Sequence, residues 1–493
     1  MRSMNRLLPM LSVVVLFCAL PAFAESAPLS TAEGVSDVLK AKRPKGGEYF
    51  GLYLLDKKVG WMFSDLTLVP GATDKVQSIQ ELYFKVGVGG AGKVSERKSR
   101  EVRVYEAKPH GRLVSMVVEQ TGDGGNQRLE VTATAKGLTV VRKRPGGPTE
   151  VKTIAPSTEL VEDADHARIA VLRHADVQGH VTDAEDLSNY NMTTTLGKEE
   201  ERTVGGVKVK VTRTTTLSEK EKIPVDLFLT EGGEVVEVNF GGQMRAMAES
   251  ESVAKRQDQV EVFGLTKVPL PQEPPPWAHD VPGSMRLVMS GIPERFWKDS
   301  YRQKYKALPD GKVEVSLTAN APKLEKKLKL PLKDPMGGPN LKSTLVVEAD
   351  NPQIQATAKK ILAGEKDPYK AAKKISAWVD KHMVKDYGAS ADRASDVLKQ
   401  MKGDCTEHSL LTVALLRAAG IPAKRVDGVV YLNQGDGPAF YWHEWVEAWV
   451  GEWTQLDPTF GQDVADATHF AVGEEGNAEI IPLIGQMKVL EVH

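Results

Sequence analysis

The stretch that decides the fold of the C-terminal part is "KGDCTEHSLLTVALLRAAGIPAKRV", residues 402–426. Asp404 is a good N-cap residue, and Glu407, three residues later, completes a D-x-x-E capping box. The following residues are apolar enough for a buried helix, which Gly420 ends. The pattern therefore predicts a buried helix with Cys405 at its first position.

Cys405 is the only cysteine after the first 24 residues. A helix N-terminus favours a nearby negative charge and so helps a thiolate to form, and its free N–H groups can hold an oxyanion. The charges of Asp404 and Glu407 oppose the thiolate. Because the dipole contributes only about 0.3–1 kcal/mol, a reactive thiol here needs a base elsewhere in the sequence.

The best candidate base is His443, in "AFYWHEWVEAWV". Strand alternation places His443 on one face with Trp445, Glu447 and Trp449. The next strand, "EWTQLDPT", ends with Asp457, whose carboxylate could hold the far nitrogen of the imidazole ring. Taken singly, each of the three residues is more often structural, but together they form a nucleophile, a base and an orienting acid.

These segments resemble the transglutaminase-like superfamily, which has a papain-like cysteine fold. The resemblance runs from about Ile361 to Thr459 and rests on "RASDVLKQMKGDCTEHSLLTVALLRAAGIPAKRVDGVVY", "HEWVEAWV" and "WTQLDPT". It implies that Cys405 is the nucleophile, His443 the general base and acid, and Asp457 the orienting residue. The family's oxyanion helper has no secure counterpart, so Tyr387, Trp378 and Asp404 are kept as support candidates.

The resemblance implies acyl transfer on amide bonds of a protein or peptide through a thioester, with a cell-wall peptide as one candidate substrate. If water resolves the thioester, the enzyme is a peptidase or amidase, which we favour. If an amine resolves it, the enzyme is a cross-linking transglutaminase. Two alternative functions remain. The protein could be a non-enzymatic envelope scaffold, or Cys405, His408 and His443 could form a Zn²⁺ site. We expect no cofactor and no metal, since no Ca²⁺-binding loop pattern occurs.

The first residues are typical of a secretory signal peptide, with an early Arg2 and Arg6, an apolar run and the small-residue site "AFA" before Glu25. We expect a periplasmic or secreted bacterial protein with no stable membrane span after removal of residues 1–24. Whether this leader is cleaved or lipidated at Cys18 stays open. The balance of 64 basic against 66 acidic side chains excludes a strongly basic nucleic-acid binder.

The chain is too long for one core, and we expect an α+β protein with several parts. After the leader (1–24), residues 25–263 alternate as an antiparallel β-rich domain, 264–284 form a proline-rich linker, and 285–349 a short β-rich segment. Residues 350–493 form a transglutaminase-like domain of helices and an antiparallel sheet. "GVGGAG" (Gly87–Gly92) fits a dinucleotide-binding pattern, but a strand-like sequence follows it, which favours a hairpin loop.

Overall fold

The computed structural model describes residues 25–493, except for 88–93, 123–124, 135, 146, 185–187, 205, 221–222, 242, 275–282, 298, 320, 324–327, 387–390, 392, 434, 436 and 475–481. The expected leader at 1–24, most of "GVGGAG" and Tyr387 therefore lie outside the described residues. The predicted α+β class with large antiparallel sheets is confirmed.

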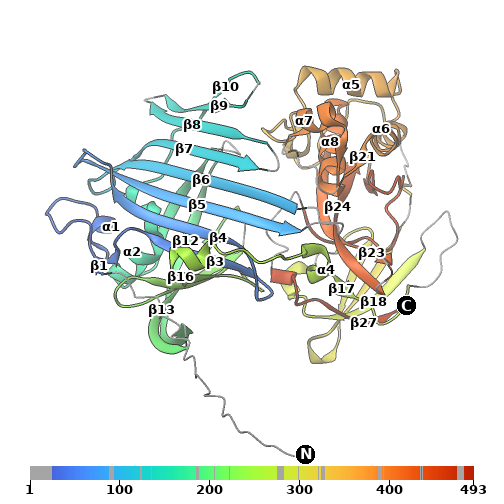
Figure 1. Cartoon of the computed structure of the whole chain (residues 1–493). Helices are drawn as coiled ribbons and strands as arrows, with labels where there is room; N and C mark the ends of the chain where they lie inside the picture. The colour runs from blue at the N-terminus through green and yellow to red at the C-terminus, as the bar shows by residue number, and fades with distance from the viewer. Residues whose placement is uncertain are drawn as a thin grey trace, which may run out of the picture.

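The N-terminal part is one continuous 14-stranded antiparallel sheet, drawn in blue to green in Figure 1. Two meanders, β3 to β10 and β11 to β16, join where Tyr49–Leu54 pair with Met244–Glu249. The strands are β3 (Glu48–Leu54), β4 (Lys57–Leu68), β5 (Lys75–Gly87), β6 (Val94–Glu106), β7 (Leu113–Gly122), β8 (Gln127–Thr134), β9 (Gly137–Lys143), β10 (Glu150–Ile154), β11 (Val177–Asp183), β12 (Ser188–Val204), β13 (Val207–Ser218), β14 (Pro224–Leu229), β15 (Val235–Asn239) and β16 (Met244–Glu249).

Helix α2 (His166–Arg173) packs on β12 and β13, inside the curve of this sheet (Figure 1). It follows the 3-10 turn η1 (Val161–Asp165), and Asp165 caps it by accepting from the backbone N–H of Arg168 at 3.4 Å. Ile169 and Ala170 are fully buried against the sheet. The small elements of this part are β1 (Ser26–Ala27), α1 (Asp37–Lys40), β2 (Arg43–Pro44), α3 (Glu251–Ala254) and α4 (Val262–Thr266).

The C-terminal part, yellow to red in Figure 1, combines two small sheets and one short parallel pair of strands with a cluster of helices. One sheet has the order β17–β24–β23–β26, with β25 beside β24, and the other has the order β19–β20–β18–β27. The strands are β17 (Val268–Pro269), β18 (Ser284–Ser290), β19 (Gln303–Ala307), β20 (Val313–Thr318), β21 (Val384–Lys385), β22 (Lys402–Gly403), β23 (Ala423–Asn433), β24 (Pro438–Trp449), β25 (Trp453–Leu456), β26 (Phe470–Glu474) and β27 (Lys488–Val492). The helices are α5 (Pro352–Leu362), α6 (Pro368–His382), α7 (Ala394–Gln400) and α8 (Cys405–Ala418), with 3-10 turns η2 (Glu294–Phe296), η3 (Pro309–Gly311) and η4 (Pro339–Leu341).

Strand β24 separates two apolar cores. Val446 and Ala448 face helices α5 to α8, whereas Phe440 joins a second core with Leu287 and Phe470. The C-terminal strand β27 pairs with β18, so residues 284–318 and the end of the chain share one sheet. Strands occupy only the first half of the expected β-rich segment 285–349.

The first described residues of the expected linker 264–284 pack against strand β24. Val268–Pro269 pair with Ala439 and Phe440 of β24, and Thr266 accepts a hydrogen bond from the indole N–H of Trp442 at 3.0 Å. This segment therefore extends the sheet that carries His443.

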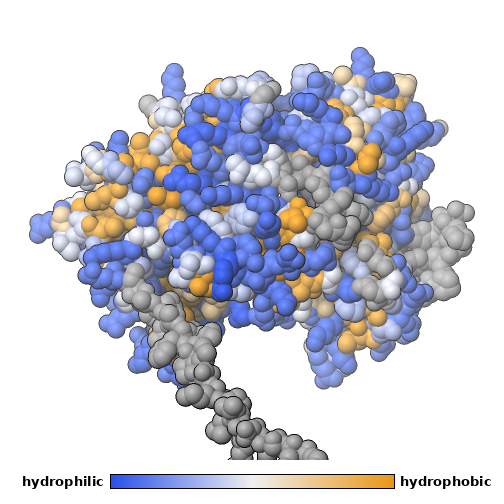
Figure 2. Space-filling model, viewed as in Figure 1, coloured by the Kyte–Doolittle hydropathy of each residue, from blue (hydrophilic) through white to orange (hydrophobic). Residues whose placement is uncertain are grey.

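Ion pairs join the N-terminal sheet to the helical cluster. Arg144 lies 2.6 Å from Asp396, and Arg393 lies 2.8 Å from Glu150. The face shown in Figure 2 is largely hydrophilic, with smaller hydrophobic patches over both parts. Within the residues that the structure describes, no helix has the length and apolar character needed to cross a membrane.

Candidate active site

Cys405 is the first residue of α8, as the capping box predicted. Asp404 accepts from the backbone N–H of Thr406 at 2.8 Å, and Glu407 accepts from the N–H of Asp404 at 2.9 Å. Leu410, Leu411 and the rest of the apolar helix are buried in the core of helices. A capped, buried helix fixes the sulfur in position, because neither the backbone nor the helix axis can shift without cost.

Cys405 is partly exposed, and its sulfur accepts a hydrogen bond from the backbone N–H of Glu444, the residue after His443. Burial, followed by the charges of Asp404 and Glu444, raises the pKa of the Cys405 thiol well above its usual range. The surrounding charges thus favour the neutral thiol, so the helix start alone does not produce a resting thiolate. Deprotonation needs a base in contact with the sulfur.

His443 and Asp457 are brought together by neighbouring strands. His443 lies on β24, Asp457 directly follows β25, and His443 Nε2 is 2.7 Å from Asp457 Oδ2. Phe460 stacks on the imidazole with 4.8 Å between ring centroids. Because Nε2 of His443 faces the carboxylate, Nδ1 is the ring nitrogen that does not face it. The charge of Asp457 also raises the pKa of the Cys405 thiol.

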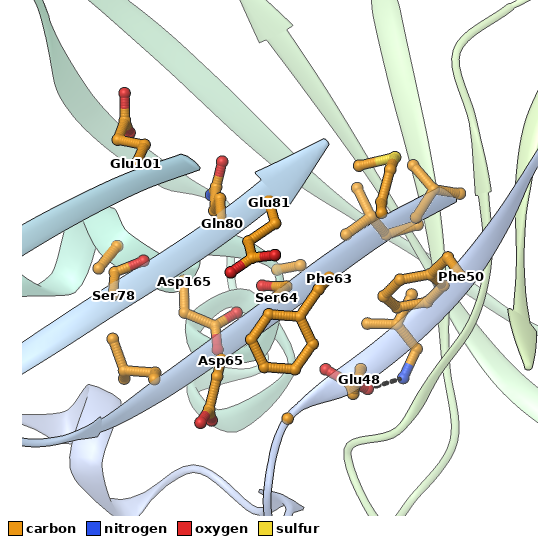
Figure 3. A pocket seen from close by; sticks show the side chains of 18 of the residues that line it. Glu48, Phe50, Phe63, Ser64, Asp65, Ser78, Gln80, Glu81, Glu101 and Asp165 are labelled. Carbon is orange, nitrogen blue, oxygen red and sulfur yellow. Dashed lines mark hydrogen bonds between the residues drawn. The ribbon is translucent and has the colours of Figure 1, made fainter. Parts of the chain in front are cut away.

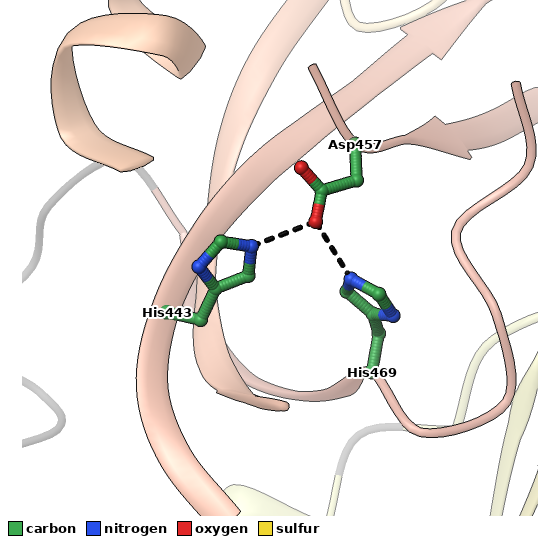
Figure 4. A group of neighbouring side chains, drawn as sticks. All are labelled: His443, Asp457 and His469. Carbon is green, nitrogen blue, oxygen red and sulfur yellow. Dashed lines mark hydrogen bonds and ion pairs between the residues drawn. The ribbon is translucent and has the colours of Figure 1, made fainter. Parts of the chain in front are cut away.

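Asp457 also binds a second histidine that the sequence reasoning missed (Figure 4). His469 Nε2 lies 2.9 Å from Asp457 Oδ2, the same oxygen that faces His443. The other oxygen, Oδ1, accepts from the backbone N–H groups of Thr459 at 2.6 Å and Phe460 at 3.0 Å. The fully buried carboxylate therefore has four hydrogen-bond donors, which meets the requirement for burying a charge.

Both ring nitrogens of His469 lie close to oxygen atoms. Its Nδ1 lies 3.1 Å from Asp466 Oδ1 and 3.3 Å from the Asp466 carbonyl oxygen, and its Nε2 faces Asp457. Every partner is an acceptor, an arrangement that favours the doubly protonated ring, in which both nitrogens donate. Burial alone would lower the pKa of His469, but hydrogen bonds to Asp457 and Asp466 raise it. Burial alone would raise the pKa of Asp457, but the charge and hydrogen bond of His443, with His469, hold it well below its usual range.

The support candidates have different positions. Trp378 stacks on His382 with 4.7 Å between centroids and packs against the helical core. Asp404 caps α8, and its carboxylate accepts hydrogen bonds, so it cannot donate one to an oxyanion. Tyr387 is outside the described residues, but the preceding Asp386 donates its backbone N–H to the Gly403 carbonyl oxygen at 2.9 Å, beside the start of α8.

The described residues contain one group of three potential metal ligands, and it is His443, Asp457 and His469. The zinc set considered from the sequence used His408 instead. His408 is fully buried, and its Nδ1 faces the Asp404 carbonyl oxygen at 2.7 Å. Within the group of His443, Asp457 and His469, direct hydrogen bonds of 2.7 and 2.9 Å already pair Asp457 Oδ2 with the Nε2 atoms of the two histidines.

Comparison with known proteins agrees with the predicted resemblance. Residues 355–458 match the family model described as the transglutaminase-like superfamily, which confirms that prediction for this part of the chain. Two curated relatives are uncharacterized proteins. One, of Mycobacterium leprae (strain TN), is 28% identical over 142 residues, which are 27% of this chain and 50% of that protein. The other, of Haemophilus influenzae (strain ATCC 51907 / DSM 11121 / KW20 / Rd), is 36% identical over 94 residues, 18% of this chain and 25% of that protein.

The chain thus spans half or less of the length of these curated relatives. Among solved structures, one described as a candidate cysteine protease from Cytophaga hutchinsonii is 17% identical, with a TM-score of 0.28, over 43% of this chain and 85% of that one. A score this low supports no conclusion about function.

Proposed function

We propose, from the membership of residues 355–458 in the transglutaminase-like superfamily, that this chain is a cysteine acyl-transfer enzyme acting on amide bonds of a protein or peptide. Cys405 is the proposed nucleophile, His443 the general base and acid, and Asp457 the orienting residue. The observation that carries the proposal is the 2.7 Å contact between His443 and Asp457, next to a sulfur that accepts from the N–H of Glu444.

In the proposed reaction, the Cys405 sulfur attacks the amide carbonyl carbon while its proton passes to Nδ1 of His443. The negative oxygen of the tetrahedral intermediate needs donors, and the backbone N–H of Cys405 is available at the helix start, since among the described residues it has no hydrogen-bond partner. The intermediate collapses as His443 returns the proton to the leaving amine, and Cys405 keeps the acyl group as a thioester. Asp457 stabilises the imidazolium of His443 throughout.

Water then attacks the thioester with His443 as base, which releases a carboxylic acid and the free thiol. We favour this hydrolysis over capture by a second amine. The leader-like residues 1–24 support the further proposal of a periplasmic or secreted location, where a cell-wall peptide is one possible substrate.

The test combines labelling with turnover. The purified chain is treated with iodoacetamide, and peptide mapping separates Cys405 from Cys18. A glutamine-containing peptide is then incubated with the chain and a fluorescent primary amine, and products are analysed by mass spectrometry. Cleaved or deamidated peptide supports hydrolysis, and an amine adduct supports cross-linking. If Cys405 reacts at the same rate in wild type and in His443→Ala, and neither kind of product forms, the enzymatic proposal fails. The non-enzymatic scaffold is then the remaining function.

A further inference from the structure

A second site lies outside the catalytic part, in a cavity inside the curve of the N-terminal sheet. The cavity has a volume of about 500 Å³ and is lined by β3 to β7 on one side and by β12 to β15 with the start of α2 on the other. Figure 3 shows side chains of β3 to β6 around it, among them Ser64, Ser78 and Gln80. A volume of this size is typical of a site for a small molecule.

One wall of the cavity is polar and has unused hydrogen-bonding capacity. Ser64 lies opposite Gln80 in the pairing of β4 with β5, and Gln80 lies opposite Glu101 in the pairing of β5 with β6. Ser78 and Ser99 lie beside this row. Within the described part of the chain, the side chains of Ser64, Ser78, Gln80 and Ser99 make no hydrogen bond. Gln80 is exposed and Ser64 and Ser99 are half-buried, so these groups are open to solvent and can pair with either water or a ligand.

The facing wall is apolar and incompletely covered. Val225, Leu227 and Phe240 line the cavity on this side, and each is only partly buried in the neighbouring core. Leu82 lines the cavity from β5 and has 40% of its surface exposed. Covering such surface is worth about 25 cal/mol for each Å² removed from water, so a hydrocarbon group on this wall would be stabilised.

The charged residues of the lining argue against an anionic ligand. Most are neutralised by each other or by arginines outside the cavity: Glu48 by Arg168 at 2.5 Å, Asp165 by Arg43 at 2.9 Å, Glu81 by Arg100 at 3.1 Å and Glu101 by Arg103 at 2.5 Å. Asp65 has no ion pair among the described residues. Only Arg43 and Arg168, which are already paired with other carboxylates, act on the charge of Asp65. A ligand carboxylate would therefore add a negative charge to an acidic lining, whereas an uncharged ligand would meet hydroxyl and amide groups.

We propose that this cavity binds an uncharged amphiphile, with its hydroxyl or amide groups against Ser64, Gln80 and Ser99 and its hydrocarbon part against Leu227 and Phe240. The two walls account for the two halves of such a molecule. The inference is independent of the proposed enzymatic reaction, because none of these residues belongs to the catalytic part.

The test uses two probes that share an eight-carbon chain, octyl β-glucoside and octanoate, each below its micellar concentration. Titration calorimetry with the full chain should show saturable binding of one glucoside. Binding of octanoate should be roughly tenfold or more weaker, because the two arginines of the lining, Arg43 and Arg168, are already paired with Asp165 and Glu48. Absence of glucoside binding, or equal affinity for the two probes, would overturn the proposal.

Variants locate the bound probe. Gln80→Leu removes a polar partner from the cavity, and we expect roughly fivefold weaker glucoside binding. Gln77→Leu is the matched control, because Gln77 lies on the same strand but not in the lining, and it should bind like wild type. Ser99→Val tests the neighbouring strand in the same way. If Gln80→Leu and Ser99→Val both bind the glucoside as tightly as Gln77→Leu, the probe binds elsewhere and the proposal fails.

Discussion

Asp457→Asn is the sharpest test of the candidate active site, because the hydrogen bonds fix how the new amide must lie. Oδ1 accepts from two backbone N–H groups, at 2.6 and 3.0 Å. Only an oxygen can take that place, so the amide NH₂ must face His443 and His469. Each Nε2 then has to accept instead of donate.

The consequence for His443 is the wrong tautomer. A neutral ring that accepts at Nε2 carries its proton on Nδ1, so it cannot take a proton from Cys405. His469 can adapt by losing one proton, since its Nδ1 still donates to Asp466. We therefore expect an intact fold and a loss of turnover of roughly 10⁴, the size found where an orienting carboxylate is made an amide in a serine protease triad.

Alkylation of Cys405 by iodoacetamide, followed against pH, measures this without a substrate. Asp457→Asn should react as slowly as His443→Ala near neutral pH, and the double variant should be no slower, because the two residues act as a unit. Asp466→Asn is the matched control, since Asp466 binds His469 but not His443. An Asp457→Asn profile that superimposes on wild type would refute the tautomer argument.

Three further predictions use the same measurements. Asp404→Asn keeps the N-cap but removes a charge that raises the pKa of Cys405, so alkylation near neutral pH should rise by roughly fivefold, equivalent to about 1 kcal/mol; an unchanged rate would contradict this. The raised pKa of His469 means that its stabilisation is complete below the unfolded pKa of about 6.5 and is lost as pH rises through the folded pKa, so the wild type should lose more stability between neutral and alkaline pH than His469→Gln does. Arg393 pairs with the buried Glu348 as well as with the partly exposed Glu150. Arg393→Met leaves Glu348 unpaired and should lower the free energy of unfolding by about 3–5 kcal/mol, whereas Glu150→Gln should lower it by less than about 1 kcal/mol. Equal losses in denaturant unfolding would refute this difference.

The features that sequence predicted well are those set by nearby residues. The start of α8 follows from Asp404 and Glu407, which lie within one helical turn of Cys405. The pairing of His443 with Asp457 could also be predicted from the sequence, because the two residues lie only 14 positions apart on adjacent strands. The family resemblance supplied their expected roles. In both cases a short segment contains all of the interacting groups.

His469 shows where this reasoning stops. It lies 12 residues after Asp457, beyond an irregular segment that has no helical or strand period, and reaches the carboxylate only because β26 pairs with β23 on the far side of the sheet. The joining of β3 to β16 has the same origin, since its partners are about 190 residues apart. Register over such separations is set by packing of the whole sheet. The same limit applies to the cavity of the N-terminal part: the alternation of Ser78, Gln80 and Leu82 predicts one face of a strand, but only the curvature of the sheet turns that face toward the apolar wall of β14 and β15 and makes a binding site of it.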